Sequence, residues 1–574
     1  MTDSNLQNNA VVASSASQWV SIVPTNGEQF NPNQKIIYDI EPELGYIKKD
    51  SYLVFDILNN SENQDRWTLQ KNLGAHAVID RVDIYSKETG ILLESLTNYS
   101  QWVNIEHQYL FDDHSNLQNQ QGVGHPVQSW TYERINATTI RKKRSKAMVN
   151  LIENNQLSPL TADGTNGGAA CYTSRRFCIP LKCGIFGHFD AEEKAIPVMN
   201  FGGLRVEITL ASPERALQRL CPVIKNNAGH YDGFFKPLDF TEGVALRADA
   251  ADQSASAGAS FKVQIGSTDA SVAWRDKLQD SGLIVGNKIE LSNLTITAGG
   301  AYRTGSVSGT ISAMEMKEDK NIVLDGVQKG LKGYIEITVA VAAAGAGPVG
   351  LATGTIKVVN APNYKITNTE FRLSQIVPPP NVADSLVKGI NYEFTSFEVF
   401  LDNIPAAPLR HQIPIHSIAS KAVSTFTQIY DTANDEGQLE SASDYYAGAL
   451  PSNIKLNDVV YFINNRLYPL RSYNPQALSD KVLSQNELVK AFRAIGKQPL
   501  SLGNSDFCDL EGYTNTPLVS RELARSGMVF DLRNSEPELR LAFSATRTNV
   551  LRANTFVFSK KIIQTTATGV QVIH

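Results

Sequence analysis

Residues Phe177–Leu210 read FCIPLKCGIFGHFDAEEKAIPVMNFGGLRVEITL and contain the clearest strand pattern of the chain. In the last seven residues of this stretch, apolar and polar side chains alternate. A period of two places alternate side chains on opposite faces of a strand, so one face is buried and the other solvated. The pair Gly202-Gly203 predicts a tight bend just before this strand. The apolar residues of the expected buried face are Leu204, Val206, Ile208 and Leu210.

The sequence on both sides of this strand also has the pattern of short strands. Short runs of β-branched and aromatic residues are separated by Gly, Pro, Asn and Asp, which is typical of an all-β sandwich or barrel. One helix is expected at Thr97–Leu110, with Thr97 or Asn98 as its cap. Further strand-like runs are Gln18–Val23, Lys35–Ile40, Tyr46–Leu58, Ala77–Tyr85, Tyr364–Ile376 and Ile390–Leu401.

A second β-rich unit follows from residue 403. Val459–Ile463 and Leu467–Leu470 flank the turn Asn464-Asn465 and predict a hairpin. A helix is expected next, with Ser484 and Glu487 as a capping box and Gly496 at its end. The sequence therefore predicts two similar units in tandem, each a β-sandwich with one short helix.

Between the two units the composition changes. Residues 241–361 are rich in Ala, Gly, Ser, Thr and Val, which predicts an inserted β-rich domain. The expected division is a flexible N-terminal arm at 1–17, the main part of the first unit at 18–225, the insertion at 226–361, the end of the first unit at 362–402, and the second unit at 403–574.

The composition of the whole chain limits the classes of function. With 574 residues and 42% hydrophobic residues the chain can bury a large core, and its net charge of −5 argues against a dedicated nucleic-acid binder. The N-terminal sequence lacks the basic and apolar regions of a signal peptide, and no apolar stretch is long enough to cross a membrane. Five cysteines fit synthesis in a reducing compartment.

Signals for catalysis, metals and cofactors are weak. The sequence has no HExxH motif and no paired CxxC motif. His411 and His416 could act as metal ligands only through tertiary proximity, and Cys171, Cys178 and Cys183 are better explained as buried thiols than as a zinc site. We therefore expect no catalytic residues, no bound metal, no cofactor and no enzymatic activity.

One basic run stands out, at Arg141, Lys142, Lys143, Arg144 and Lys146. Three interpretations remain open: a solvated loop, a patch that faces phosphates of a genome or an inner membrane, and a nuclear import signal. The concentration of charge in an otherwise neutral chain leads us to expect an inward-facing basic patch in an assembly.

The order of these features resembles one viral family. Residues 177–210 are similar to its passage with Pro-Leu, Gly-Ile-Phe, Ile-Pro and Leu-Arg-Val-Glu-Ile-Thr-Leu, here from Pro180 to Leu210. Tyr364, Ile366, Asn368 and Phe371 match a second passage, and the hairpin and helix at 461–496 match a third. The chain thus resembles the double jelly-roll major capsid proteins of tailless icosahedral double-stranded DNA viruses, most closely those of virophages and polinton-like viruses.

This resemblance implies an all-β fold of two tandem eight-stranded jelly rolls, with the insertion as a tower and a short helix in each roll. It implies a homotrimer of pseudo-hexagonal outline that tiles an icosahedral capsid around a double-stranded DNA genome, located in the virion after synthesis in the host cytoplasm. Implied partners are minor capsid, penton or cement proteins, the genome or an inner membrane, and a host receptor at the tower.

Two other classes of function remain as alternatives. A surface adhesin or carbohydrate-binding protein of several β-sandwiches would also be β-rich, although the chain lacks a signal peptide and a clear linker. A β-rich enzyme such as a polysaccharide lyase or glycosidase would need a convergent acidic, histidine or metal site, which the sequence does not display.

Overall fold

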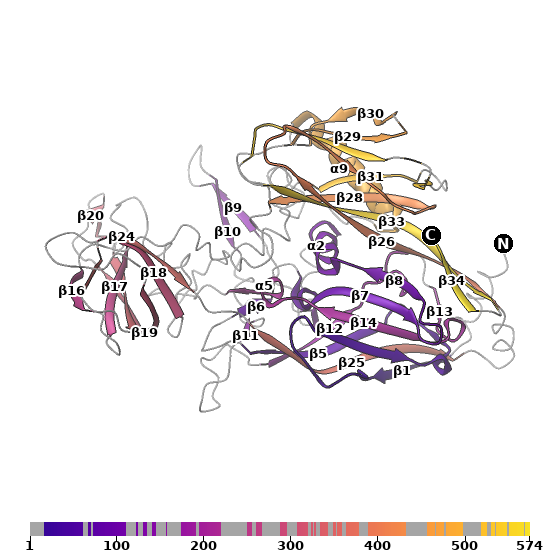
Figure 1. Cartoon of the computed structure of the whole chain (residues 1–574), viewed down its shortest axis with the longest axis horizontal. Coiled ribbons are helices and arrows are strands. Elements are labelled where there is room, and N and C mark those ends of the chain that lie inside the picture. Colours follow the sequence, from indigo (N-terminus) through magenta and orange to yellow (C-terminus); the bar gives the residue numbers. More distant parts are fainter. Residues whose placement is uncertain are drawn as a thin grey trace.

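A computed structural model gives the arrangement of the chain (Figure 1). It describes residues 16–60, 67–69, 73–110, 122–123, 130–134, 140–144, 156–157, 174–190, 194–219, 250–254, 260–266, 288–295, 307–318, 323–324, 327–328, 333–341, 348–351, 353–358, 363–377, 389–431, 456–464, 466–475, 478–497, 518–524, 530–533, 535, 537–547, 550–566 and 569–574. The expected arm at 1–17 lies outside this part of the chain, except for its last two residues, which begin a strand.

Eight strands of the first unit form two facing sheets in jelly-roll order. If the strands are lettered B to I along the chain, one sheet has the order B-I-D-G and the other C-H-E-F, the pattern that two Greek keys produce. The four main strands of the BIDG sheet are β1 (Ala16–Ile22), β25 (Tyr364–Val377), β5 (Tyr52–Asn59) and β12 (Ser174–Pro180), and the short strands β2 (Gln29–Phe30), β4 (Tyr46–Ile47) and β13 (Ile196–Pro197) also pair within it. The CHEF sheet consists of β3 (Lys35–Ile40), β14 (Leu204–Leu210), β7 (Ile79–Ser86) and β8 (Leu92–Leu96).

The second unit repeats this order strand for strand, so the chain contains two jelly rolls. Its BIDG sheet consists of β26 (Asn391–Ile404), β33 (Leu551–Thr566), β28 (Ala422–Asp431) and β31 (Leu518–Glu522), and β34 (Gly569–Ile573) pairs antiparallel with the end of β33. Its CHEF sheet consists of β27 (Arg410–Pro414), β32 (Glu538–Phe543), β29 (Leu456–Ile463) and β30 (Arg466–Tyr473).

The strand expected at 204–210 is confirmed as β14, the H strand of the first roll. Its apolar side chains are buried, and it pairs antiparallel with β3 on one side and β7 on the other. The bend before it contains Gly202 and Gly203, with φ of 70° and 78°. A Cβ on Gly203 would lie 2.8 Å from the carbonyl oxygen of Ile40, so this bend requires glycine.

The boundary between the rolls differs from the expectation. Residues 391–402 were assigned to the end of the first roll, but β26 pairs with β33 along its whole length, from Asn391↔Gln564 to Ile404↔Leu551. It is the B strand of the second roll. The apolar alternation of a strand does not reveal which sheet it joins, because the partner residues in β33 lie 147 to 173 positions later in the sequence (551 − 404 and 564 − 391).

The expected insertion leaves the first roll between its H and I strands. Its described strands pair among themselves and with neither roll (Figure 1). Five of them form one sheet, in the order β17 (Ser260–Gly266), β22 (Gly333–Val341), β19 (Val307–Glu318), β18 (Lys288–Thr295) and β24 (Thr353–Val358). Two shorter pairs are β16 (Ala250–Ser254) with β23 (Pro348–Leu351), and β20 (Val323–Leu324) with β21 (Val327–Gln328).

In each roll, the described residues between the F and G strands include a long helix. Helix α2 (Tyr99–Leu110) confirms the helix expected at 97–110. Helix α9 (Leu478–Ala494) begins six residues before the expected cap, so Ser484 lies buried inside it and the predicted capping box is wrong. Its end is as expected: Gly496 has φ of 70°, and Lys497 donates its backbone N–H to the carbonyl oxygen of Phe492, as in a Schellman motif.

The expected hairpin around Asn464 is confirmed by the pairing of β29 with β30, and Asn464 has φ of 50°, as a tight hairpin turn requires. Asn465 lies outside the described residues. The remaining short elements are β2 (Gln29–Phe30), β4 (Tyr46–Ile47), β13 (Ile196–Pro197), β6 (Trp67–Leu69), β11 (Gln156–Leu157), β15 (Leu217–Arg219), β9 (Trp130–Arg134), β10 (Ile140–Arg144), α5 (Pro213–Ala216), η1 (Pro42–Leu44), η2 (Gly74–Val78) and η3 (Met199–Phe201).

The two longest connections of the first roll leave from one end. In a jelly roll, the BC, DE, FG and HI connections leave from one end and the CD, EF and GH connections from the other. The first roll's long FG and HI connections, at 97–173 and 211–363, therefore share one end. The start of β1 and the end of β33, with β34, lie at the opposite end (Figure 1). Among the described residues, no helix is long and apolar enough to span a membrane.

Candidate functional site

The two rolls meet in a buried seam. We define the seam as helix α2 and residues 181–190 of the first roll, together with β26, β28, β33 and α9 of the second. Apolar residues of both rolls form one continuous buried cluster across it, whereas the second roll also has a separate core between its own two sheets. The seam is therefore part of the main core, and the two rolls are packed as one body.

Trp102 of α2 is the centre of the seam. Its side chain is fully buried and its ring lies among six phenylalanine rings, with the shortest centroid distance, 4.5 Å, to Phe558. Only one of the six, Phe189, belongs to the first roll. Aromatic pairs at such distances add stabilisation beyond the area that they bury. The six rings belong to Phe189, Phe397, Phe426, Phe492, Phe556 and Phe558.

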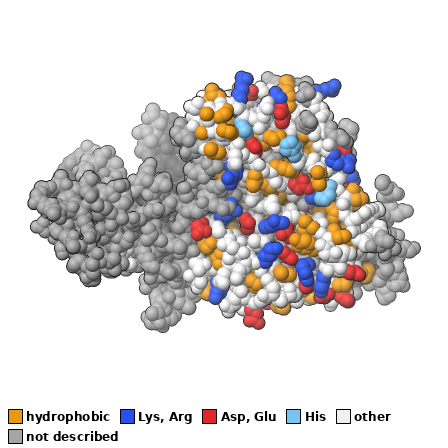
Figure 2. All heavy atoms as spheres, viewed as in Figure 1, with side chains coloured by type: hydrophobic (Ala, Val, Ile, Leu, Met, Phe, Trp, Pro, Cys, Tyr) orange, Lys and Arg blue, Asp and Glu red, His pale blue; other side chains and the backbone are white. Residues whose placement is uncertain are grey.

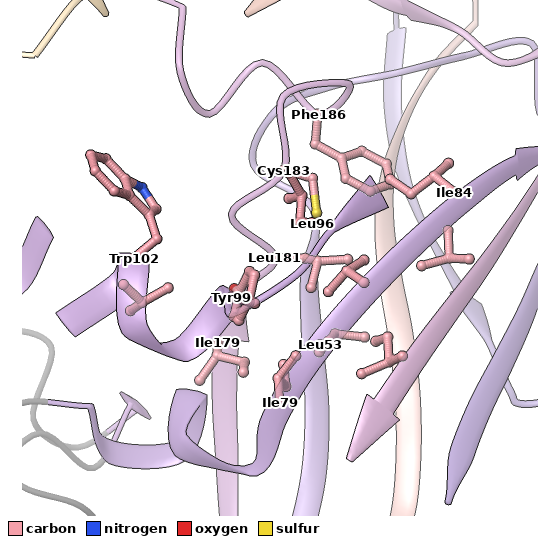
Figure 3. Close-up of a cluster of buried hydrophobic side chains, with 14 of the residues drawn as sticks. Leu53, Ile79, Ile84, Leu96, Tyr99, Trp102, Ile179, Leu181, Cys183 and Phe186 are labelled. Atoms are coloured by element: carbon pink, nitrogen blue, oxygen red, sulfur yellow. The ribbon is translucent and has the colours of Figure 1, made fainter. Parts of the chain in front are cut away.

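Helix α2 is enclosed on both sides. Tyr99 points into the first roll, among Leu53, Ile79 and Ile179, whereas Trp102 extends away from this group (Figure 3). The Tyr99 hydroxyl accepts a hydrogen bond of 3.1 Å from the backbone N–H of Lys182. One helix thus belongs to the core of the first roll and also contacts the sheet of the second.

Hydrogen bonds between buried side-chain amides also connect the two rolls. Gln101 of α2 donates to the side-chain oxygen of Gln428 in β28 at 2.8 Å, and it accepts a hydrogen bond from Asn554 in β33. All three side chains are buried. Because an unpaired buried amide is costly, these bonds favour one register between the rolls.

Beside the aromatic rings lies a buried ionic cluster centred on Glu106. Its carboxylate lies 3.4 Å from Nζ of Lys182, 3.0 Å from Nε2 of His188 and 3.3 Å from Nζ of Lys497. Lys182 also contacts Nε2 of His107 at 2.9 Å. Lys497 follows helix α9, so its bond to Glu106 joins the second roll to the first.

Burial and charge set the ionisation of this cluster. Burial alone would raise the pKa of Glu106, but Lys182 and Lys497 hold that pKa well below its usual range. Burial lowers the pKa of Lys182 to about 8 against the opposing effect of Glu106. Burial likewise lowers the pKa of His188 to about 4, so its ring is neutral at pH 7. At neutral pH the carboxylate therefore faces two cations and a neutral imidazole.

Glu94 of β8 forms a second polar contact across the seam. Its carboxylate accepts 2.9 Å hydrogen bonds from the backbone N–H groups of Gly184 and Ile185, and one of 2.5 Å from Ser396 of β26. Burial raises the pKa of this carboxyl group, and these hydrogen bonds oppose the rise. The contact is so close that a Cβ on Gly184 would lie 2.1 Å from the carbonyl oxygen of Thr395.

The seam is suited to holding two sandwiches in a fixed orientation. Among the residues that the structure describes, no group of three or more His, Cys, Asp or Glu side chains could hold a metal ion. On the visible face of the described rolls, hydrophobic, basic and acidic side chains are intermixed, without a large patch of one charge (Figure 2).

The structure shows the surroundings of the histidines and cysteines that were weak metal candidates. His411 lies 2.6 Å from a carboxylate oxygen of Asp402, and His416 is exposed. Cys183 is buried in the main core, and burial raises the pKa of its thiol well above the ordinary value. Cys178 is partly exposed on β12, and Cys171 lies outside the described residues.

The basic run falls partly on a described strand. Residues 140–144 form β10, which pairs with β9 in a hairpin between the F and G strands of the first roll. Lys146 and the side chains of Arg141, Lys142, Lys143 and Arg144 lie outside the described residues, so the expectation that the run faces inward remains a prediction. The FG connection leaves the roll from the same end as the insertion.

Sequence reasoning did not identify the seam. The aromatic partners of Trp102 come from five later segments of the chain: residues 181–190, β26, β28, α9 and β33. Glu106, Lys182, His188 and Lys497 are ordinary charged residues in the sequence and meet only in the folded chain. A charged residue within an otherwise apolar helix face, as Glu106 is, was the one available signal.

Comparison with known proteins gives a likeness at the level of architecture. No family model and no curated protein sequence matches the chain. The Faustovirus major capsid protein is similar, with 8% identity, coverage of 96% of this chain and 90% of that chain, and a TM-score of 0.49. The PBCV-1 virus capsid model has 9% identity, coverage of 98% and 97%, and a TM-score of 0.45.

The mavirus major capsid protein is also similar, with 11% identity, coverage of 97% of this chain and 90% of that chain, and a TM-score of 0.36. Because all three TM-scores are below 0.5, the assignment of the fold rests on the strand pairing of this chain, which gives the BIDG and CHEF orders twice. The chain is a double jelly roll, and the solved structures that it resembles are major capsid proteins of double jelly-roll viruses.

Proposed function

We propose that this chain is the major capsid protein of an icosahedral virus, a structural subunit without enzymatic activity. The observation that carries the proposal is the pair of jelly rolls with identical strand order, joined through one continuous core. Such a body is a rigid wedge whose strand edges are short, and it supplies two similar building blocks for a closed shell.

The proposed assembly is a homotrimer of pseudo-hexagonal outline that tiles a capsid around a double-stranded DNA genome. Three copies would supply six rolls. Minor capsid, penton or cement proteins would fill the positions that trimers cannot occupy, and the protein would reside in the virion. A surface adhesin with several sandwiches is the competing proposal, but its modules would be expected to have separate cores.

The two ends of the molecule differ, and this suggests its orientation. The insertion would stand on the outer surface, where a long connection can vary without disturbing the scaffold and can contact a host receptor. The basic run belongs to a connection that leaves from the same end. Two expectations therefore conflict, because the insertion would face outward whereas the basic run was expected to face inward. Brief protease treatment of intact shells would show which of the two segments is accessible.

The mass of the purified protein tests the proposal first. Light scattering is expected to give three times the 62.9 kDa of one chain, and negative-stain images are expected to show hexagonal particles or shells. A stable monomer that never forms a lattice would contradict the capsid proposal and would favour the adhesin.

A further inference from the structure

Strand β34 is an edge strand near the end of the chain, opposite the end of the rolls from which the insertion leaves (Figure 1). Among the described strands it pairs only with β33. Proteins usually protect such edges with charged residues or proline, because an unpaired edge can take up a further strand. The edge strands β12, β27 and β30 each contain arginine and proline, whereas β34 reads GVQVI. The edge of β34 is therefore suited to pairing.

The hydrogen bonds of β33 show which backbone groups of β34 point outward. Along a strand, successive residues direct their N–H and C=O groups to opposite sides. Thr565 of β33 donates its N–H to the carbonyl oxygen of Ile390 at 2.9 Å, on the side of β26, so its two neighbours point toward β34. Gln571 lies opposite one of these neighbours and points back to it. Val570 and Val572 therefore direct their N–H and C=O groups away from β33, where no described residue bonds to them.

The side chains of β34 lie on two faces. Val570 and Val572 pack against the main core. On the other face Gln571 is exposed and Ile573 is 44% exposed. Gly569 is on this face too, and a Cβ there would meet nothing within 4 Å. The outer face of β34 thus has a projecting apolar side chain at one end, a polar side chain in the middle and open space at the other end.

We propose that β34 pairs antiparallel with the β34 of a second copy, about a two-fold axis at Gln571. In this register the N–H of Val570 in one copy donates to the carbonyl oxygen of Val572 in the other, and the reverse. Ile573 of each copy lies opposite Gly569 of the other and occupies the open space there. The edge is therefore self-complementary, as a contact between two identical surfaces requires.

This contact cannot itself build a trimer, because copies around a threefold axis meet through two different surfaces. It goes beyond the proposed function, and it rests on that function only in that the paired strands would join one trimer to the next. A pair of strands of 5 residues each buries less than the roughly 1,000 Å² that a stable interface needs. One contact is therefore weak, and many contacts in one shell act together.

A disulfide at the two-fold axis tests the contact in the full-length chain. Gln571→Cys places two thiols at facing positions whose Cα atoms would be about 4.5 Å apart, within the range of a disulfide. Mild oxidation is expected to link two chains into a species of 125.8 kDa (2 × 62.9) on a non-reducing gel. The unmodified chain gives the background from its own cysteines.

Gln564→Cys is the matched control. The side chain of Gln571 donates a hydrogen bond of 2.6 Å to that of Gln564, so both lie on the same face. In the proposed contact the two copies of residue 564 would be three strand spacings apart, about 14 Å, which is too far for a disulfide. This variant is therefore expected to link no more than the unmodified chain does.

Charged variants at the same position test the contact in solution. Gln571→Glu and Gln571→Lys each place like charges at facing positions, and each is expected to weaken association between trimers about 5- to 10-fold. An equal mixture of the two is expected to restore association, because opposite charges then face each other. Sedimentation velocity over a dilution series gives these values, and the trimers themselves should persist in every sample.

The outcomes separate this inference from the proposed function. A chain that forms no trimer but is linked through Gln571→Cys would contradict the capsid proposal and support the paired strands. Trimers in which Gln571→Cys links no better than Gln564→Cys would leave the capsid proposal standing and overturn the pairing. Charged variants that weaken association without recovery on mixing would also overturn it, since the edge would then hold a different segment.

Discussion

At the scale of single residues, Gly184 shows how close the two rolls approach. Its Cα faces the backbone of β26, and a Cβ would lie 2.1 Å from the carbonyl oxygen of Thr395 and 2.7 Å from Oε1 of Glu94. Neither neighbour can move freely, because one is backbone and the other is held by three hydrogen bonds. Glycine here is a requirement of packing between the rolls.

Substitution Gly184→Ala is therefore expected to destabilise the chain by about 2–4 kcal/mol, since it forces the rolls apart in a tightly packed core. Denaturant unfolding gives the value. The control is Gly90→Ala, where φ is 68° but nothing lies within 4 Å of the added atom, so the cost is expected to be about 1 kcal/mol. Equal losses at both glycines would contradict the role given to Gly184.

His188 makes stability depend on pH. Its pKa of about 4 in the folded chain lies below the unperturbed value of 6.5. As pH falls from about 6.5 to 4, the unfolded chain takes up a proton that the folded chain does not, so folded stability declines. His188→Gln is expected to reduce the loss of stability between pH 7 and 4.5 by about 2–3 kcal/mol.

The measurement is the free energy of unfolding at a series of pH values. His416→Gln, a change at an exposed histidine, serves as control and is expected to leave the pH dependence as it is. An unchanged slope in the His188 variant would mean that the pKa of this ring is the same in the folded and the unfolded chain.

At the scale of elements, helix α2 joins the rolls. Trp102→Ala removes a side chain that contacts rings from β26, β28, β33 and α9. We expect a loss of about 3–5 kcal/mol, the usual range for a buried tryptophan. Both rolls should still unfold in one transition at a lower denaturant concentration, because they share a core.

Leu467→Ala, at a partly exposed position of β30, is the control for Trp102 and is expected to change stability by less than about 1 kcal/mol. Two separate transitions in the unmodified chain would mean that the rolls are independent domains, contrary to the continuous core.

The elements also show what sequence could and could not predict. The alternation at 204–210 revealed β14 because one face of that strand is buried in its own roll. The start of α9 was misjudged because Ser484 and Glu487 have capping spacing, yet Glu487 binds Arg521 of β31 instead. The site was not predicted because Glu106 meets Lys497 across 391 positions of the chain (497 − 106), and local patterns carry no such information.

At the scale of the whole molecule, the insertion is a separable part. The described ends of the connection that contains it lie close together, since the hydroxyl of Tyr364, the first residue of β25, donates to the carbonyl oxygen of Ala211 at 2.6 Å. Replacing residues 226–361 with a short Gly/Ser linker is therefore expected to leave the double roll folded, because loop closure depends weakly on length.

Circular dichroism and light scattering of this deletion variant test that expectation. Retention of a cooperative transition and of the unmodified chain's oligomeric state is the expected result. Loss of the folded rolls would show that the insertion contributes to the core, and the control is a chain that carries the same linker in addition to the insertion.

The pairing of β1 with β25 has a consequence for synthesis. The last residue of β1 is Ile22 and the first of β25 is Tyr364, so 342 positions (364 − 22) separate two strands that lie side by side. At about 5–20 residues per second, a ribosome needs roughly 20–70 s to cover that distance. During this time β1 and β5 on the nascent chain lack the strand that lies between them. The first roll therefore closes only after its insertion has been made, and its open strand edges must be kept from other chains until then.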